Sequence, residues 1–441
     1  MTDPTYDPVL ASRLRGYAEG GVRAIDALEI AEGAIANRRP RRSARPALTL
    51  LAAAFLIVGA AVAALVAGAN HVPALPTGSV VFGYADNGLR SMWRVDLPSN
   101  VSTEFVRSRR GSAVSPDGRH FAWVDTRPNE NDQVHLGDTT SLQDVVLPTG
   151  GQVWATQDPV TTTPACYGCP NSTFTWSPGG RWVSWVDCAG VSTCHLVVSA
   201  SDGSSRKVLQ PSFFASEVNT PQAWLFWQRD DQLIVRLPGL GPQLADGDGA
   251  NLRPMPDGRL PDSPDGRWTV VGTRSDLTIV AQDKTVKSRV TFAGEDFSGV
   301  LIGLWAPDSS LLTILFNGAS DPGDYRFDQL GLVGVDGHAA RVDVPGGIDV
   351  APRDLRSLPA TVRWSPDSSR LVASGTIVGR DGRLIETIAD VGIAAWSRDS
   401  RHLAVAGPAS SRLSVVDADG SHRQEIGAPT PAQVDQLVWV P

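Results

Sequence analysis

Four cysteines give the strongest sign of chemistry in this sequence of 441 residues. Cys166 and Cys169 form a Cys-x-x-Cys pair, and Cys188 and Cys194 follow closely in the chain. A tight set of four cysteines can form two disulfides, bind a structural zinc ion through four thiolates, or include a redox-active Cys-x-x-Cys pair. The surrounding sequence favours disulfides.

The stretch "WVDCAGVSTCHLVV" predicts two strands joined by a short loop, with Cys188 and Cys194 at its base. We therefore expect these two cysteines to pair, which leaves Cys166 to pair with Cys169. Zinc remains an alternative because the cysteines occur in pairs, although thiolates are hard to keep reduced outside the cell, where we place this part of the chain below. The redox alternative lacks the βαβ pattern that surrounds such a motif.

Other candidate sites are weaker. The stretch "ADGDGAN" brings Asp246, Asp248 and Asn251 together as in a calcium loop, but no later glutamate completes the loop, so we predict a hairpin turn. His120 and His402 each follow a turn by two residues, where side chains usually face solvent. No nucleophile elbow, His-Glu-x-x-His motif or phosphate-binding glycine loop occurs. The sequence therefore predicts no catalytic residue, no cofactor and no metal site.

The elements that position these residues are short strands in a repeated pattern. An apolar strand, often ending on tryptophan, meets a turn of the Ser-Pro-Asp-Gly type, and an alternating apolar strand follows. The copies are "SAVSPDGRHFAWVD" from Ser112, "FTWSPGGRWVSWVD" from Phe174, "LPDSPDGRWTVVG" from Leu260, "GLWAPDSSLLTILF" from Gly303, "VRWSPDSSRLVASG" from Val362 and "AAWSRDSRHLAVAG" from Ala394. We expect the tryptophans to pack between neighbouring repeats: Trp176, Trp305, Trp364 and Trp396.

Four strands per repeat, with a period of about 40 residues, are typical of β-propeller blades. One interval between turns is twice this length, and "AWLFWQRDDQLIVRLPG" from Ala223 supplies a degenerate blade within it. Three strands from Ser79 lack an inner partner, and the chain ends on a single strand, "DQLVWVP". We expect these strands to combine into one composite blade that closes the ring and removes exposed sheet edges. The fold class is therefore an all-β propeller over residues 79–441, with eight blades, or seven if the degenerate stretch is an insertion.

The Trp-Ser-Pro-Asp-Gly turn, the alternating strand after it and the "VDADG" hairpin resemble the WD40-like repeats of TolB-type β-propellers. The resemblance covers roughly residues 79–441 and implies a propeller fold. Propellers of this type serve as periplasmic scaffolds, ligand-binding modules and non-catalytic parts of oligopeptidases, so the resemblance does not select one function. No α/β domain like that of TolB precedes the repeats in this sequence, so TolB's own partners are not expected to carry over.

The segment before the repeats predicts membrane anchoring. Residues 47–69, "ALTLLAAAFLIVGAAVAALVAGA", carry no charge and no proline, and as a helix they would span about 35 Å. Five arginines between Arg38 and Arg45 come before this run, which places the N-terminus in the cytoplasm. A cleaved signal peptide is the alternative, since Ala67-Gly68-Ala69 offers a cut site. We expect a retained, single-pass signal anchor, followed by a linker over 70–78 and an extracytoplasmic propeller.

Residues 1–46 show helical periodicity in two short amphipathic stretches and are expected to be cytoplasmic. Their apolar faces fit either a cytoplasmic protein partner or the membrane surface. The layout resembles that of membrane-bound anti-sigma factors, but no histidine or cysteine occurs in this segment, so the zinc-binding anti-sigma motif is absent.

Charge and motifs together limit the function. A formal net charge of -8 argues against binding to nucleic acid, which needs a basic surface. The leading hypothesis is a non-enzymatic propeller that binds a protein or cell-envelope ligand, as a scaffold or sensor. The alternative is a propeller hydrolase or lyase with a calcium-dependent site in the central channel. Within the propeller, we expect ligand contacts in the loops 126–134, 156–172 and 317–328.

Overall fold

The structure is a computed structural model of the whole chain, which divides into Met1–Pro73 and Ala74–Pro441. It describes residues 75–86, 89–109, 111–127, 130–154, 174–189, 193–210, 212–213, 224–236, 243–255, 262–273, 276–281, 283, 286–290, 301–316, 326–349, 362–407, 412–427, 432 and 434–440. The predicted cytoplasmic segment 1–46, the predicted membrane helix 47–69 and most of the linker 70–78 lie outside these residues. Among the residues that are described, no helix is long and apolar enough to span a membrane.

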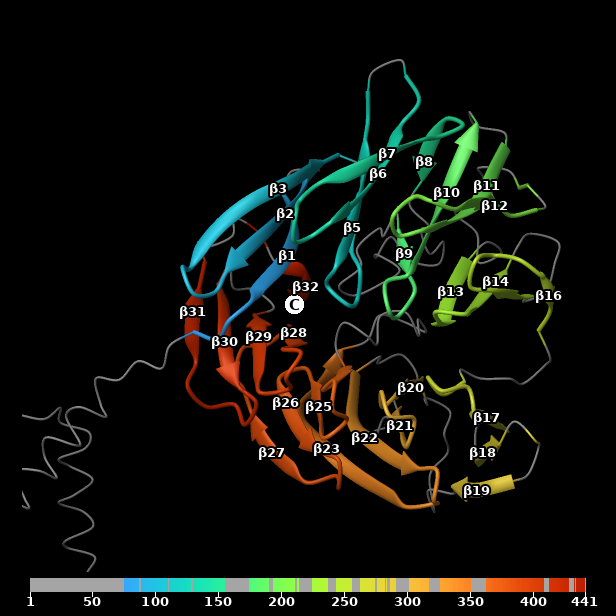
Figure 1. Cartoon of the computed structure of the whole chain (residues 1–441). Helices are drawn as coiled ribbons and strands as arrows, with labels where there is room; N and C mark the ends of the chain where they lie inside the picture. Colours follow the sequence, from blue (N-terminus) through green and yellow to red (C-terminus); the bar gives the residue numbers. More distant parts are fainter. Residues whose placement is uncertain are drawn as a thin grey trace, which may run out of the picture. The chain divides into compact units, whose positions relative to one another are not determined.

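The described strands form eight antiparallel sheets, which we call blades 1 to 8 (Figure 1). Blade 1 contains β1 (Ser79–Asp86), β2 (Leu89–Asp96), β3 (Val101–Ser108) and β32 (Val434–Val440). Blade 2 contains β4 (Ser112–Val114), β5 (His120–Asp125), β6 (Gln133–Asp138) and β7 (Asp144–Pro148). Blade 3 contains β8 (Gln152–Trp154), β9 (Thr175–Trp176), β10 (Trp182–Ala189), β11 (Thr193–Ala200) and β12 (Arg206–Val208). Blade 4 contains β13 (Trp224–Arg229), β14 (Gln232–Arg236), β15 (Gln243–Asp246) and β16 (Arg253–Pro254).

The second half of the chain continues the series. Blade 5 contains β17 (Trp268–Thr273), β18 (Asp276–Ala281) and β19 (Val286–Val290). Blade 6 contains β20 (Leu301–Trp305), β21 (Leu311–Phe316), β22 (Arg326–Gly334) and β23 (Ala339–Asp349). Blade 7 contains β24 (Val362–Trp364), β25 (Arg370–Ala373), β26 (Thr376–Gly379) and β27 (Leu384–Thr387). Blade 8 contains β28 (Ile393–Trp396), β29 (His402–Ala406), β30 (Leu413–Asp417) and β31 (Gln424–Ile426).

The predicted closing blade is confirmed. Strand β1 pairs with β2 on one side and with the C-terminal strand β32 on the other, from Ser79 opposite Val440 to Tyr84 opposite Val434. In Figure 1 the red β32 lies beside the blue β1 near the centre of the ring. The degenerate stretch from Ala223 forms blade 4, a sheet of its own, so the described strands give eight blades rather than seven.

Two blades depart from the predicted four strands. Among the described residues blade 5 has three strands, and residues 256–261 before its turn lie outside the described part of the chain. In blade 3 the inner strand is in two pieces: β8 pairs with Val186–Cys188 of β10, and β9 pairs with Val183 and Ser184 further along the same strand. Residues 155–174 join these two pieces, a break that the repeat pattern alone does not reveal.

A Ser-x-Asp sequence explains the tight turn that precedes the second strand in blades 2, 5, 7 and 8. In blade 7 the Ser365 hydroxyl donates to Asp367 Oδ1 at 2.6 Å, and the same carboxylate oxygen accepts the backbone N–H of Ser369 at 3.0 Å. The backbone N–H of Arg370, the first residue of β25, donates to Ser365 Oγ at 3.0 Å. Equivalent bonds form at Ser115–Asp117, Ser263–Asp265 and Ser397–Asp399. The two side chains thereby satisfy backbone donors that the turn leaves unpaired.

These turns also join neighbouring blades. Backbone N–H groups of turn aspartates donate to serine hydroxyls in the next blade's turn, at 3.0 to 3.1 Å: Asp265 to Ser309, Asp308 to Ser368 and Asp367 to Ser400. The three serines have φ angles between 60° and 62°, a left-handed conformation that the same turn position gives to Gly118 and Gly266. Between blades 4 and 5, Arg229 lies over Gly266, where any Cβ would collide with the guanidinium.

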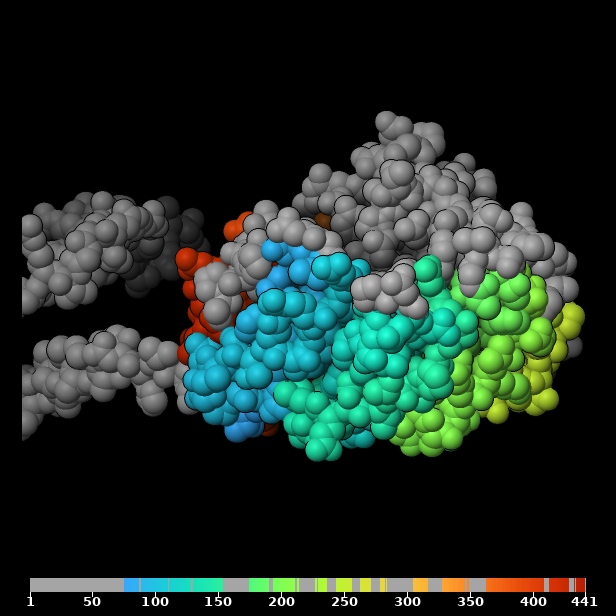
Figure 2. All heavy atoms as spheres, turned by 90° about the horizontal axis from the view of Figure 1, so that it is seen from above, coloured from blue at the N-terminus to red at the C-terminus, as the bar shows by residue number. Residues whose placement is uncertain are grey.

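The hydrophobic core lies between blades. Seven clusters of buried side chains each combine residues of two adjacent blades, including blades 8 and 1 at the closure. Figure 2 shows blades 1 to 4 side by side along the rim, from blue through teal and green to yellow. As predicted, Trp176, Trp305, Trp364 and Trp396 are buried in these clusters. The indole of Trp396 donates to the carbonyl of Arg363 in the preceding blade at 3.0 Å, so the ring sets blade spacing and also forms a hydrogen bond.

Candidate functional site: two unlike faces and an acid with a raised pKa

The two ends of the strands differ in how the chain connects them. At one end lie the turns between first and second strands and those between third and fourth strands, and we call this end the turn face. Between described strands its connections run no longer than residues 247–252. Many of its side chains are engaged in the bonds within and between turns described above. This face therefore serves mainly to hold the ring together.

The opposite end, which we call the connection face, has the longer connections. Among them are residues 209–223 between β12 and β13, 291–300 between β19 and β20, 317–325 between β21 and β22, and 350–361 between β23 and β24. The loops 126–134 and 317–328, predicted to contact ligand, connect strands at this face. Most of 317–328 and all of 156–172 lie outside the described residues.

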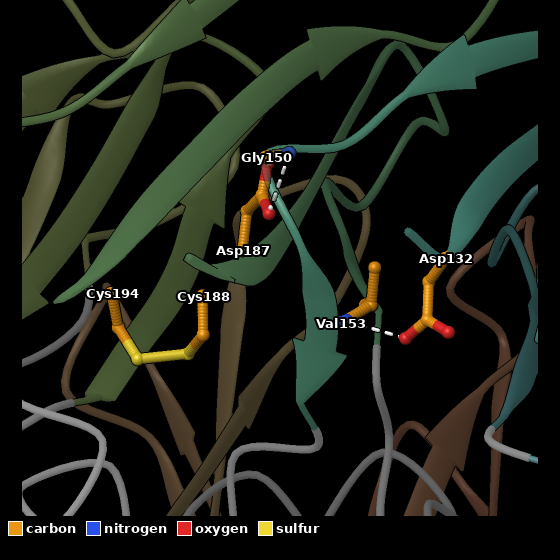
Figure 3. Close-up of a disulfide and its surroundings, with 6 residues drawn as sticks. All are labelled: Asp132, Gly150, Val153, Asp187, Cys188 and Cys194. Carbon is orange, nitrogen blue, oxygen red and sulfur yellow. Dashed lines mark hydrogen bonds between the residues drawn. A yellow bond between two sulfur atoms is a disulfide. The ribbon is translucent and has the colours of Figure 1, made fainter. Parts of the chain in front are cut away.

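The Cys188–Cys194 disulfide is confirmed (Figure 3). The two residues face each other across β10 and β11 with their Cα atoms 4.0 Å apart. The backbone N–H and C=O of Cys194 both bond to Phe213 on the other side of β11, so the pair occupies a non-hydrogen-bonded position, where side chains approach most closely. Both residues are fully buried in the cluster between blades 3 and 4. Their bond excludes the four-thiolate zinc site, while Cys166 and Cys169 lie outside the described residues and their pairing stays a prediction.

Two carboxylates fix the chain between blades 2 and 3, next to the broken inner strand (Figure 3). Asp132 is 2% exposed and accepts the backbone N–H of Val153 at 2.8 Å. Asp187 accepts the backbone N–H of Gly150 with both oxygens, at 3.0 and 2.9 Å, and pairs with Arg206 at 3.0 Å. These acids anchor the entry into β8, and so they act as structural groups.

The predicted hairpin at Asp246 is present between β15 and β16. Asp246 accepts hydrogen bonds from the side chains of Asn251 at 2.6 Å and Arg253 at 3.2 Å. Asp248 instead accepts the backbone N–H of Ala250 at 2.8 Å. The oxygens that resemble calcium ligands in the sequence are thus engaged in closing the turn.

The prediction that His120 and His402 face solvent is wrong. Each imidazole is partly buried and stacks on an inner-strand tryptophan of the next blade, with ring centroids 6.3 Å apart: His120 on Trp176 and His402 on Trp439. The reason is that the second strand begins beside the neighbouring blade's inner strand, which places its first side chain at the blade interface. Aromatic stacking, rather than solvent exposure, explains these two histidines.

Sequence reasoning missed the most unusual titratable group of the described chain, Asp435 at the start of β32. Its carboxylate accepts hydrogen bonds from Arg90 Nη2 with both oxygens, each at 2.7 Å. Burial raises the pKa of Asp435 to about 6, although the Arg90 guanidinium favours the ionised form. The signal in the sequence is that Asp435 and Gln436 are the polar residues of an otherwise apolar closing strand. The pair lies at the connection-face end of blade 1, because β32 begins there and β2 starts just after the β1–β2 connection.

An acid with a shifted pKa often marks a functional site, but structural ion pairs have the same property. Asp435 is bound to one arginine of its own blade, and this pair ties the C-terminal strand β32 to β2. Among the described residues, no group of three His, Cys, Asp or Glu side chains is placed to hold a metal ion. The geometry of the Arg90–Asp435 pair fits a structural role.

No protein-family model matches this chain, and no curated protein matches it significantly. Among solved structures, TolB from Acinetobacter baumannii is 12% identical over 86% of this chain and 70% of TolB, with a TM-score of 0.34. The dihydro-heme d1 dehydrogenase NirN is 14% identical over 83% of this chain and 76% of NirN, with a TM-score of 0.47. A eukaryotic initiation factor is 16% identical over 83% of this chain and 99% of its own, with a TM-score of 0.46. The propeller assignment rests on this chain's own strand pairing and blade-to-blade contacts.

Proposed function

We propose that this protein is a membrane-anchored binding protein whose propeller lies outside the cytoplasm and holds a protein or cell-envelope ligand on its connection face, without catalysis. The observation that carries the proposal is the difference between the two faces. Side chains of the turn face bond blade to blade, whereas the longest connections join strands at the opposite end. Loops on a rigid scaffold are where binding residues usually occur.

The disulfide supports the location. Cys188 and Cys194 form a bond typical of proteins that fold in an oxidising compartment. The arginine cluster before residues 47–69 predicts the same orientation, with the propeller on the outer side. Extraction of cell membranes with alkaline carbonate tests the anchor. We expect the full-length protein to stay in the membrane pellet and a variant lacking residues 1–69, exported with a cleavable signal, to be released.

The ligand itself is sought by affinity purification of the tagged protein from gently solubilised membranes. We expect envelope proteins or envelope polymers to co-purify with the full-length protein and with a variant lacking residues 1–46. A stabilisation of the protein by calcium ions that EDTA reverses, together with hydrolysis of a sugar or lactone substrate, would instead favour the channel enzyme and contradict this proposal.

A finer form of the proposal makes residues 1–46 the output of the propeller, in the manner of an anti-sigma factor. Its support is the layout of a short amphipathic segment, one apolar run and a large outer domain. In the same purification, a transcription factor is then expected with the full-length protein and is lost when residues 1–46 are deleted. If the deletion leaves both the recovered proteins and transcription unchanged, the segment is only an anchor extension.

A further inference from the structure

The seam between the first and last strands has an irregular register at Asp435. Gly83 of β1 pairs with Gln436, and Tyr84 pairs with Val434, so Asp435 is an extra residue in β32 that has no partner in β1. Such a bulge redirects the extra side chain. Asp435 Oδ1 lies 3.7 Å from the position a Cβ on Gly83 would take, an ordinary van der Waals distance, so the carboxylate lies beside Gly83.

Two further side chains fix β32 close to Asp435: that of Gln436, in β32 itself, and that of Arg363, in blade 7. The Gln436 amide donates to the carbonyl of Ser112 at 2.8 Å and accepts the backbone N–H of Val114 at 3.2 Å, which satisfies the free edge of β4 in blade 2. Arg363 of blade 7 donates to the carbonyl of Leu437 at 3.0 Å. The C-terminal strand is therefore held from three blades within residues 435–437, and the Arg90–Asp435 pair is its one ionic contact among the described residues.

The electrostatic surroundings of Asp435 are simple. Strands β1, β4, β28 and β29 pack against β32, and Arg363 of β24 also reaches it, at the carbonyl of Leu437 rather than at the Asp435 carboxylate. Strands β4 and β28 carry no charged residue, His402 of β29 stacks on Trp439 at the other end of β32, and Asp86 lies past the last β1 residue that pairs with β32. Arg90 of β2 is the charged group that contacts the carboxylate. Burial thus opposes ionisation of Asp435, and Arg90 is the cation bonded to its carboxylate that favours the ionised form.

We infer that the seam between β1 and β32 is a pH-dependent latch, which holds the C-terminal strand more tightly in mildly acidic than in neutral solution. The direction follows from proton linkage. The pKa of the carboxyl is about 6 when the seam is closed and near its ordinary value of 3.8 when Asp435 is free in water. Between these values the closed seam binds a proton that the open seam lacks, so lowering the pH favours closure. The stabilisation is fully present below pH 3.8 and is lost as the pH rises through 6.

Hydrogen exchange followed by mass spectrometry tests the latch on the full chain in mild detergent. Peptides covering β32 are compared at pH 5 and pH 7, after correction for the intrinsic exchange rates, with peptides covering β14 in blade 4 as an internal control. We expect the protection of β32 relative to β14 to rise about tenfold from pH 7 to pH 5. In Asp435→Asn, whose neutral amide has nearly the same shape, this ratio is expected to stay constant.

A second variant, Arg90→Gln, tests whether the ion pair sets the pH at which protection changes. Arg90→Gln removes the cation that favours the carboxylate, so its increase in β32 protection is expected to begin at a higher pH than in the wild type. The latch is refuted if the wild-type ratio is the same at both pH values, or if β32 loses protection at pH 5. If either variant fails to fold, the wild-type ratio of β32 to β14 protection at pH 5 and pH 7 decides the test by itself.

Discussion

The backbone N–H of Asp308 in blade 6 donates to the hydroxyl of Ser368 in blade 7 at 3.0 Å. Ser368 is 1% exposed and has a φ of 60°, so a buried serine adopts a conformation that glycine tolerates better. A left-handed backbone conformation costs a residue with a Cβ about 1–2 kcal/mol, and a hydrogen bond contributes about 0.5–1.5 kcal/mol to stability. The two effects are of similar size, which explains how serine and glycine both occur at this turn position in different blades.

This relationship predicts the effect of two substitutions at Ser368. Ser368→Ala keeps the Cβ but leaves the Asp308 N–H without its acceptor, and should lower the free energy of unfolding by about 1–3 kcal/mol. Ser368→Gly also removes the acceptor, but glycine adopts the left-handed conformation without strain, so the free energy of unfolding should fall by less. Ser374→Ala is the matched control, since Ser374 has a φ of 45° and makes no cross-blade bond among the described residues. Urea unfolding measures all three. Equal losses for Ser368→Ala and Ser374→Ala would contradict the role of the hydroxyl.

The tryptophan between blades 6 and 7 offers a second test. Trp364 Nε1 donates to Thr313 Oγ1 at 2.9 Å, and Thr313 is fully buried. Trp364→Phe and Thr313→Val each remove one partner, while the double variant removes both. We expect a coupling energy of about 1 kcal/mol in the double-mutant cycle. Trp364→Phe leaves the buried Thr313 hydroxyl without the indole donor, while in Thr313→Val the indole keeps only its longer bond to the Leu304 carbonyl at 3.4 Å. Additive losses would mean that the indole acts by packing alone.

The disulfide should resist reduction in the native state. Both cysteines are 0% exposed, so 1 mM dithiothreitol is expected to reduce Cys188–Cys194 only when denaturant is added. Mass spectrometry of alkylated peptides measures this directly. The Cys188→Ala/Cys194→Ala variant should lose about 2 kcal/mol of stability, given the short loop that the bond closes. Rapid alkylation of these two cysteines in native buffer would show that the interface between blades 3 and 4 opens readily.

Acid should weaken the turn face. Burial opposes ionisation of Asp367, but bonds from the Ser365 hydroxyl, from the N–H and hydroxyl of Ser369 and from Ser400 outweigh it and lower its pKa below 3.8. A carboxyl with a depressed folded-state pKa contributes stability above its unfolded value, and this stability is lost as the pH falls through the folded value. Thermal midpoints should therefore drop below about pH 4. Asp367→Asn should flatten part of that drop, while Glu130→Gln, an exposed control, should not. An unchanged slope in Asp367→Asn would contradict this account.

The sequence alone predicts most of the architecture because local rules govern it. The Ser-Pro-Asp turns, the tryptophans before them and the composite closing blade follow from turn chemistry and from the need to remove sheet edges. The Cys188–Cys194 pair follows from hairpin geometry. Asp435 could not be assigned, since its partner Arg90 is 345 residues away and a bulge directs it there. The stacking of His120 depends on the neighbouring blade, which a single repeat does not contain.

Photo-crosslinking in living cells shows which face of the propeller binds the ligand. A photoreactive amino acid replaces Glu130, which is exposed in the β5–β6 connection on the connection face, or Ser204, which is exposed in the β11–β12 turn on the turn face. We expect a defined crosslinked product from position 130 and none from position 204, with both proteins folded and in the membrane fraction. Crosslinking from position 204 alone would place the ligand on the turn face and contradict the account.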